Sequence, residues 1–331
     1  MPGVIRRGAL LAAVALASAA PLAAQTFPVA DSTLQRMWTL GMDSSRTWSL
    51  AQTLTDSIGP RLNGSPGHKA GNDWLVAMYR SWGIEARNEQ YGTWRGWDRG
   101  VTHLDLLTPR VRSLEAMMLA WSAGTGGRAV EAGTVALPDA ADSAAFQAWL
   151  PSVRGKFVLA SMPQMTCRTD ANLKEFATDS TYGKLTRERE AQRTAWTERM
   201  RRTGLETAEM HEAIAAAGAR GILTSLWSNG WGVQKIFGTR VARVPVVDVS
   251  CEDYGLLWRL TENRQGPTLR LRAEARALGE VPVFNTIATI PGTGKPDEYV
   301  MLSAHFDSWD GSSGATDNAT GTVTMLEAMR I

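Results

Sequence analysis

The sequence predicts an α/β protein in which a mixed sheet is flanked by helices, and two patterns near its end carry this prediction. Residues 299–304, YVMLSA, form an apolar run with the length and composition of a buried strand. After a Gly/Ser-rich loop, apolar or small side chains recur at a helical spacing, namely at Ala319, Val323, Leu326 and Met329. A strand, a loop and a helix in this order are typical of an open α/β sheet, which binds its ligands at strand ends.

The first 125 residues supply further elements of both kinds. Residues 32–57 carry a helical pattern of apolar residues that stops at a Gly-Pro pair. The next helix is predicted over 66–82, with Ser65 as N-cap and Pro66 at the first helical position. His68 lies near the start of this helix, and we interpret it as solvated or capping rather than catalytic. Three strand-like runs then predict the first strands of the sheet, at 84–91, 101–107 and 114–121.

The end of the apolar run delivers residues that can bind a metal ion. His305 and Asp307 follow the predicted strand, and Asp317 opens the predicted helix after a loop from Gly311 to Gly314. Neutral imidazole and carboxylate are good zinc ligands, and a carboxylate has two oxygens with which to bridge two ions. Spacing alone leaves a second interpretation open, in which the histidine is a hydrogen-bonded core residue and Asp317 an N-cap.

A longer stretch narrows these alternatives. The segment SAHFDSWDGSSGATDNATGTVTMLEAMR resembles the metal-binding segment of the zinc-dependent exopeptidases that include carboxypeptidase Q (plasma glutamate carboxypeptidase) and bacterial leucyl aminopeptidases. The resemblance implies that His305 binds one zinc ion and that Asp317 bridges two. It also implies that Asp307 supports the site from outside the coordination shell. It covers roughly thirty residues with both motifs at the right separation, so it is far more specific than an H-x-D pair.

The same resemblance implies a domain organisation. SIGPRLNGSPG resembles the opening of these exopeptidases, which places the N-terminal part of the peptidase domain at 25–127. Short strands and helices over 128–278 resemble an inserted, β-rich protease-associated domain, within which the charged residues 183–217 predict a solvated helical excursion. The peptidase domain then resumes over 279–331, beginning with the strand-like VFNTIATI.

The implied activity is zinc-dependent exopeptidase hydrolysis of small peptides near a free terminus, as a dipeptidase or aminopeptidase. In the family, a catalytic Glu-Glu pair, a further acidic ligand and a last histidine lie downstream of the helix that Asp317 opens, and this sequence stops at Ile331. We therefore expect the chain to be a C-terminally truncated fragment, in which the exopeptidase fold is incomplete. Such a fragment should bind zinc weakly, should be inactive, and should leave the apolar face of its last helix exposed. The alternative is a non-catalytic, receptor-type binding protein that uses the same fold.

Composition sets limits on partners. With 331 residues and 44% hydrophobic content, the chain is long enough for two domains and a sizeable core. The chain has 35 Lys and Arg residues and 33 Asp and Glu residues, a net charge of +2. It therefore lacks the excess of basic residues that would predict a nucleic-acid partner. A homodimer is compatible with the sequence, which decides neither the oligomeric state nor the peptide end that is attacked.

The first residues predict export. Residues 1–24 combine a short basic head, an apolar stretch and small residues, the pattern of a signal peptide, with an uncleaved anchor as the alternative. No other run reaches the ~20 apolar residues of a membrane span. We therefore expect a periplasmic or secreted protein. In that compartment Cys167 and Cys251 could pair, although two free buried thiols fit the sequence equally well.

Overall fold

The computed structural model describes residues 30–228 and 236–331, so the predicted signal peptide, 1–24, lies outside the described residues. Its eight strands form one mixed sheet in the order β2-β1-β8-β4-β5-β6-β7-β3. Strands β4 to β7 run parallel to one another, and the remaining pairs are antiparallel. The predicted α/β class is confirmed.

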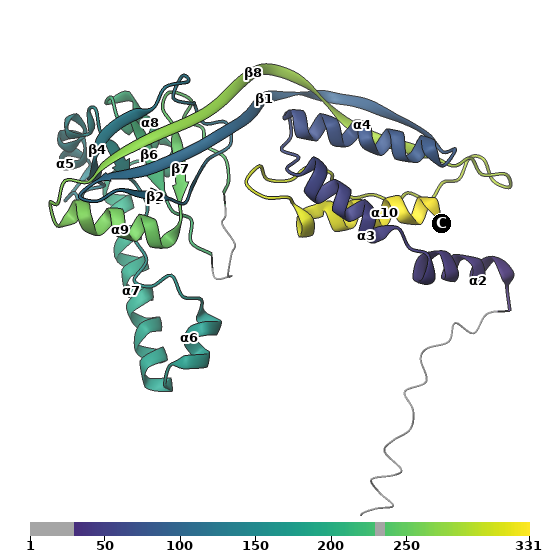
Figure 1. Cartoon of the computed structure of the whole chain (residues 1–331), viewed down its shortest axis with the longest axis horizontal. Helices are drawn as coiled ribbons and strands as arrows, with labels where there is room; N and C mark the ends of the chain where they lie inside the picture. Colours follow the sequence, from purple (N-terminus) through teal and green to yellow (C-terminus); the bar gives the residue numbers. More distant parts are fainter. Residues whose placement is uncertain (1–29, 229–235) are drawn as a thin grey trace, which may run out of the picture.

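Two very long strands connect the two lobes of the molecule (Figure 1). Strand β1, Glu85–Thr108, pairs with β8, Thr268–Thr289, along almost its entire length. The sequence predicted two separate strands here, with a break at the intervening glycines. Instead the chain passes through these glycines with register shifts, including one after Gly96, because an irregularity in the ladder accommodates residues that would otherwise require a turn.

The first lobe, residues 31–91 and 283–331, is called the helical lobe. Its elements are α2 (Ser32–Trp38), η1 (Thr39–Asp43), α3 (Thr47–Gln52), η2 (Thr53–Ile58), α4 (Pro66–Ser81), η4 (Ala315–Ala319) and α10 (Thr320–Arg330). As predicted, α4 begins with Pro66 and Ser65 caps it, with its hydroxyl accepting from the N–H of His68 at 3.2 Å.

The prediction that the apolar face of the last helix, α10, is exposed is wrong. Val323 and Leu326 are 1% and 0% exposed, since they pack in a core cluster with Leu50 and Leu54 of the N-terminal helices and with Tyr79 of α4. Figure 1 shows α3 lying beside α10. Segments nearly three hundred residues apart in the sequence thus complete one small core.

The second lobe, the described part of residues 97–277, is called the sheet lobe. Its strands are β2 (Arg112–Leu114), β3 (Ala116–Met118), β4 (Val130–Ala136), β5 (Phe157–Leu159), β6 (Gly221–Thr224) and β7 (Val246–Val249). Its helices are α5 (Ser143–Trp149), η3 (Leu150–Val153), α6 (Asp170–Phe176), α7 (Asp179–Arg202), α8 (Thr207–Ala216) and α9 (Cys251–Glu262).

The sheet lobe buries a separate cluster on each side of its sheet. One cluster receives Tyr254 and Leu257 of α9, and the other receives Phe146 of α5 with Met210 and Ile214 of α8. Helix α6 and the N-terminal part of α7 project from the lobe as an arm (Figure 1), while Trp196 and Met200 of α7 pack against the second cluster. The boundaries 128–278 of a protease-associated domain stay a prediction.

The predicted buried strand at 299–304 is wrong. These residues form no strand, and Tyr299 and Val300 are 84% and 93% exposed. An apolar run becomes a strand only where a neighbouring strand pairs with it. Among residues 30–228 and 236–331 no strand pairs with this run.

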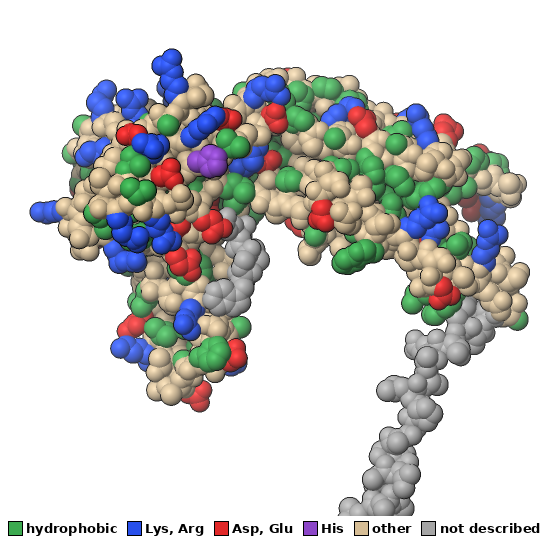
Figure 2. All heavy atoms as spheres, viewed as in Figure 1, with side chains coloured by type: hydrophobic (Ala, Val, Ile, Leu, Met, Phe, Trp, Pro, Cys, Tyr) green, Lys and Arg blue, Asp and Glu red, His purple; other side chains and the backbone are tan. Residues whose placement is uncertain are grey.

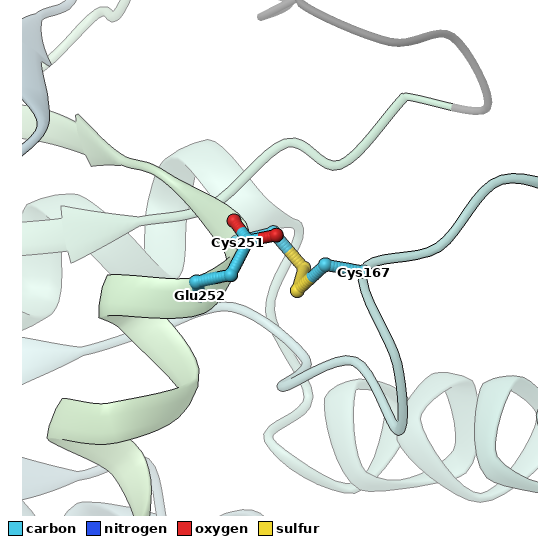
Figure 3. A group of neighbouring side chains, drawn as sticks. All are labelled: Cys167, Cys251 and Glu252. Carbon is cyan, nitrogen blue, oxygen red and sulfur yellow. A yellow bond between two sulfur atoms is a disulfide. The ribbon is translucent and has the colours of Figure 1, made fainter.

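The two cysteines form a disulfide, with their Cα atoms 5.8 Å apart. The bond ties the loop before α6 to the first turn of α9, and Figure 3 shows Glu252 beside it. No described helix has both the length and the apolar character that crossing a membrane requires. On the face shown in Figure 2, Lys and Arg side chains are interspersed with Asp and Glu over both lobes.

Candidate metal centre

The structure brings the three predicted site residues together in the helical lobe. His305 Nε2 lies 2.9 Å from Asp317 Oδ1, and His305 Nδ1 lies 3.1 Å from Asp307 Oδ1. The imidazole therefore stands between two carboxylates, one at each ring nitrogen. The tautomer that donates its Nδ1–H to Asp307 leaves the Nε2 lone pair available to a cation beside Asp317.

These donors fit zinc, but they are too few to form a complete site. Their side chains are accessible, 54% exposed for His305 and 71% for Asp317. A zinc ion takes three or four protein ligands. Within the described part of the chain, three potential donors converge only at Cys167, Cys251 and Glu252, where both sulfurs are spent on the disulfide (Figure 3). His305 and Asp317 therefore fit one part of a zinc site.

A buried arginine from the other end of the chain fixes the loop that carries these residues. Arg61 is fully buried, and its guanidinium donates to the carbonyls of Phe306 at 3.0 Å, Ser313 at 3.0 Å and Gly314 at 3.2 Å. Burial lowers the pKa of Arg61, and the nearby Asp307 opposes that shift. Because the planar fork reaches both ends of residues 306–314, it sets the shape of this loop.

Backbone contacts reinforce that clamp. The N–H of Ser308 donates to the carbonyl of Arg61 at 3.0 Å, and the N–H of Arg61 donates to the Ser308 hydroxyl at 2.9 Å. The sequence interpretation singled out the SIGPRLNGSPG stretch but missed the role of its arginine. A charged residue between a Gly-Pro pair and a helix cap was the only available signal.

His68 is buried, so its interpretation as solvated is wrong. It is 5% exposed, and its ring lies 5.6 Å from that of Phe306. Phe306 approaches the helix closely because Gly71 presents no side chain, and a Cβ there would lie 2.5 Å from the ring. Burial lowers the pKa of His68, with Asp307 raising it and Arg61 lowering it further. His68 thus packs against the Phe306 ring at the start of the loop.

A cleft of about 250 Å³ opens beside the candidate ligands. Its lining includes His305, Asp307, Asp317, Trp94, Trp121 and Trp309. Three tryptophans from distant parts of the sequence meet here, a feature that sequence reasoning missed because no local pattern links them. A hollow of about 300 Å³ beside the disulfide is slightly larger, but it offers no comparable pair of ligands.

Comparison with known proteins finds similarity to one peptidase family. Residues 285–331, which contain all three site residues, match the model of Peptidase family M28. This segment is similar to the M28 peptidases. Carboxypeptidase Q from Mus musculus is 26% identical over 293 residues, which cover 88% of this chain and 55% of that protein. The Homo sapiens protein is 23% identical over 291 residues, with the same coverage.

Two solved structures share the fold. A Peptidase M28 precursor from Shewanella amazonensis SB2B superposes with a TM-score of 0.56 at 22% identity, covering 90% of this chain and 62% of that one. BSAP, a zinc aminopeptidase from Bacillus subtilis, gives a TM-score of 0.50 at 19% identity, covering 86% and 56%. The chain spans about half the length of the curated relatives that it matches.

Proposed function

We propose that the protein acts as a zinc-dependent exopeptidase that hydrolyses small peptides near a free terminus. One observation carries this proposal: His305 Nε2 lies 2.9 Å from Asp317 Oδ1. The pair lies at the edge of an aromatic cleft, and both residues belong to the segment that matches peptidase family M28. The names of its relatives, carboxypeptidase Q and a zinc aminopeptidase, support the reaction class and the metal.

Each residue of the site has a role in this proposal. His305 and Asp317 would hold zinc, His305 through Nε2 and Asp317 through its carboxylate. Bound zinc would polarise the peptide carbonyl and lower the pKa of a water molecule. Asp307 fixes the His305 tautomer through Nδ1, and the Arg61 clamp keeps the loop in the shape that brings both ligands together.

Among the described residues, no third donor converges on His305 and Asp317. The glutamate that follows the site in the sequence, Glu327, is unsuited to proton transfer. It is 5% exposed, and its carboxylate is occupied by Arg330 at 2.7 Å and by the N–H of Arg46 at 2.8 Å. The Arg330 hydrogen bond is the main cause of its lowered pKa. We therefore propose that the 331-residue chain by itself binds zinc weakly and is inactive.

Zinc titration and a hydrolysis assay test this proposal separately. Calorimetry of the 331-residue chain should show weak zinc binding that His305→Ala abolishes, and two tightly bound ions would overturn the incomplete site. The full-length product should hydrolyse a dipeptide such as Ala-Ala, and a chelator should remove that activity. N-acetylated and C-amidated dipeptides identify the free end that is required. A full-length product that binds zinc without hydrolysing any of them would favour the receptor-type alternative.

Asp307 offers a graded test of the same site. Asp307→Ala should reduce zinc affinity about 10- to 100-fold, because removing a partner that orients a ligating histidine has that effect. Asp297→Ala is the matched control, since it removes one exposed carboxylate from a turn ahead of the site. Equal losses in both variants would show that overall charge, and not the contact with His305, governs zinc binding.

We also propose a periplasmic or secreted location, with the sheet lobe as a protease-associated domain. The Cys167–Cys251 disulfide supports the location, because such bonds persist in oxidising compartments. Cell fractionation with N-terminal sequencing tests it. A mature protein that begins near Gln25 in the exported fraction would support it, and a cytoplasmic protein that retains residues 1–24 would overturn it.

A further inference from the structure

Trp121 has a backbone conformation that bulky residues rarely adopt. Its φ is 61°, in the left-handed region that disfavours side chains with a Cβ, and such outliers concentrate at functional sites. Two hydrogen bonds hold the chain in place there. The N–H of Ala120 donates to the Phe237 carbonyl at 3.0 Å, and the N–H of Thr239 donates to the Ala120 carbonyl at 2.9 Å.

The Trp121 ring is fixed as firmly as its backbone. A Cβ on Gly238 would lie 2.5 Å from two ring carbons, so the ring packs where only glycine leaves room. The Arg95 guanidinium lies 3.9 Å from the ring centroid, within the range of a cation–π contact. The indole Nε1–H donates to the Arg95 carbonyl at 3.2 Å. The orientation of the Trp121 ring is therefore fixed before any ligand binds.

The same segment of the sheet lobe also contacts the loop beside the metal ligands. Phe237 packs edge-on against Trp309, with ring centroids 4.6 Å apart. Next to it, Arg99 of β1 forms an ion pair with Asp310, whose side chain is 9% exposed. The cleft therefore has walls from both lobes. Trp121 is on the sheet lobe, Trp309 is on the metal loop, and Trp94 lies on β1 between them.

These walls are suited to an aromatic guest. Trp94 and Trp309 are 45% and 42% exposed, so large apolar surfaces remain open to a ligand beside His305 and Asp317. The cleft holds about 250 Å³, and an apolar cavity of about 150 Å³ is already enough to bind benzene. We infer that Trp121 is a specificity-determining residue that, with Trp94 and Trp309, receives an aromatic side chain of the substrate. This inference rests on the proposed peptidase function.

Binding of two reaction products tests the inference without requiring catalysis. Free phenylalanine should bind the zinc-loaded protein about 3- to 10-fold more tightly than free alanine, the range that an aromatic pair contributes. Calorimetry gives this ratio. Trp121→Gly should bring it close to one, because glycine adopts the same positive φ and removes only the ring. Trp48→Ala, which removes a tryptophan that is 85% exposed on α3, should leave the ratio unchanged.

A second variant keeps the test decisive if Trp121→Gly unfolds. Gly238→Ala retains the Trp121 ring but displaces it, and should also lower the phenylalanine-to-alanine ratio. Equal binding of the two amino acids to the unchanged protein would overturn the pocket. A ratio retained in the folded variants would overturn the role of Trp121. If the protein hydrolyses no dipeptide but still binds phenylalanine more tightly than alanine, and this preference depends on Trp121, only the proposed activity is contradicted.

Discussion

Each of the two lobes buries an ionisable side chain, but one side chain is buried in its charged form and the other in its neutral form. In the helical lobe, Arg61 is 0% exposed and keeps its charge, because backbone carbonyls surround its guanidinium. In the sheet lobe, Asp248 is 3% exposed and receives only the Leu226 N–H at 2.9 Å and the Thr224 hydroxyl at 3.3 Å. Burial raises the pKa of Asp248 to about 7, so below that pH it is mostly neutral.

This difference follows from the number of partners. A buried ion is stable only when hydrogen bonds replace its hydration, and a carboxyl with few donors takes up a proton instead. The charged group lies where the structure must hold a loop that carries candidate ligands. The neutral group lies near the ends of β6 and β7, in the other lobe. Three perturbations probe this contrast.

Loss of Arg61 should have the largest effect. Arg61→Met fills similar space but leaves the carbonyls of Phe306, Ser313 and Gly314 without their donor, and we expect about 3–5 kcal/mol of destabilisation in urea unfolding. Arg61→Lys should recover little of it, because an ammonium group cannot reproduce the planar fork.

An exposed arginine provides the matched control. Arg276 is 71% exposed and pairs with Asp98 at 2.7 Å, so Arg276→Met should change the free energy of unfolding by less than about 0.5 kcal/mol. Equal effects at Arg61 and Arg276 would refute the clamp. Zinc binding should weaken only in the Arg61 variants.

Asp248 should show an effect that depends on pH. Its folded pKa, about 7, is above its ordinary value of 3.8, so its stabilisation is complete below pH 3.8 and is lost as the pH rises to 7. Asp248→Asn keeps an oxygen acceptor for Leu226 and Thr224 but has no charge to bury. We expect it to be more stable than the natural protein by about 4 kcal/mol at pH 8 and nearly equal to it at pH 4. Urea unfolding at the two pH values measures this, and parallel curves would contradict it.

What the sequence could predict depended on how local each signal was. The helix after Ser65 was predictable because its N-cap and first proline are adjacent residues. The pairing of His305 with Asp317 was expected because the resemblance spans one continuous segment. That they bind zinc stays a prediction. The disulfide was left open because cysteine spacing alone does not determine which residues pair.

Long-range features could not be predicted in this way. The clamp joins Arg61 to a loop 245 residues away, and the aromatic cleft gathers Trp94, Trp121 and Trp309 through the packing of two lobes. The apolar run at 299–304 gave a misleading signal, because its composition indicates a strand whereas pairing decides whether one forms.

The smallest effect is expected in that run, which lies directly before the clamped loop. Replacing Tyr299 and Val300 together by serine alters side chains that are 84% and 93% exposed, and we expect less than about 0.5 kcal/mol of change in the free energy of unfolding. Urea unfolding at two protein concentrations is the measurement. A loss above about 1 kcal/mol that grows with concentration would mean that a second molecule covers these residues. The run would then be stabilised by a partner, much as the neighbouring loop is stabilised by Arg61.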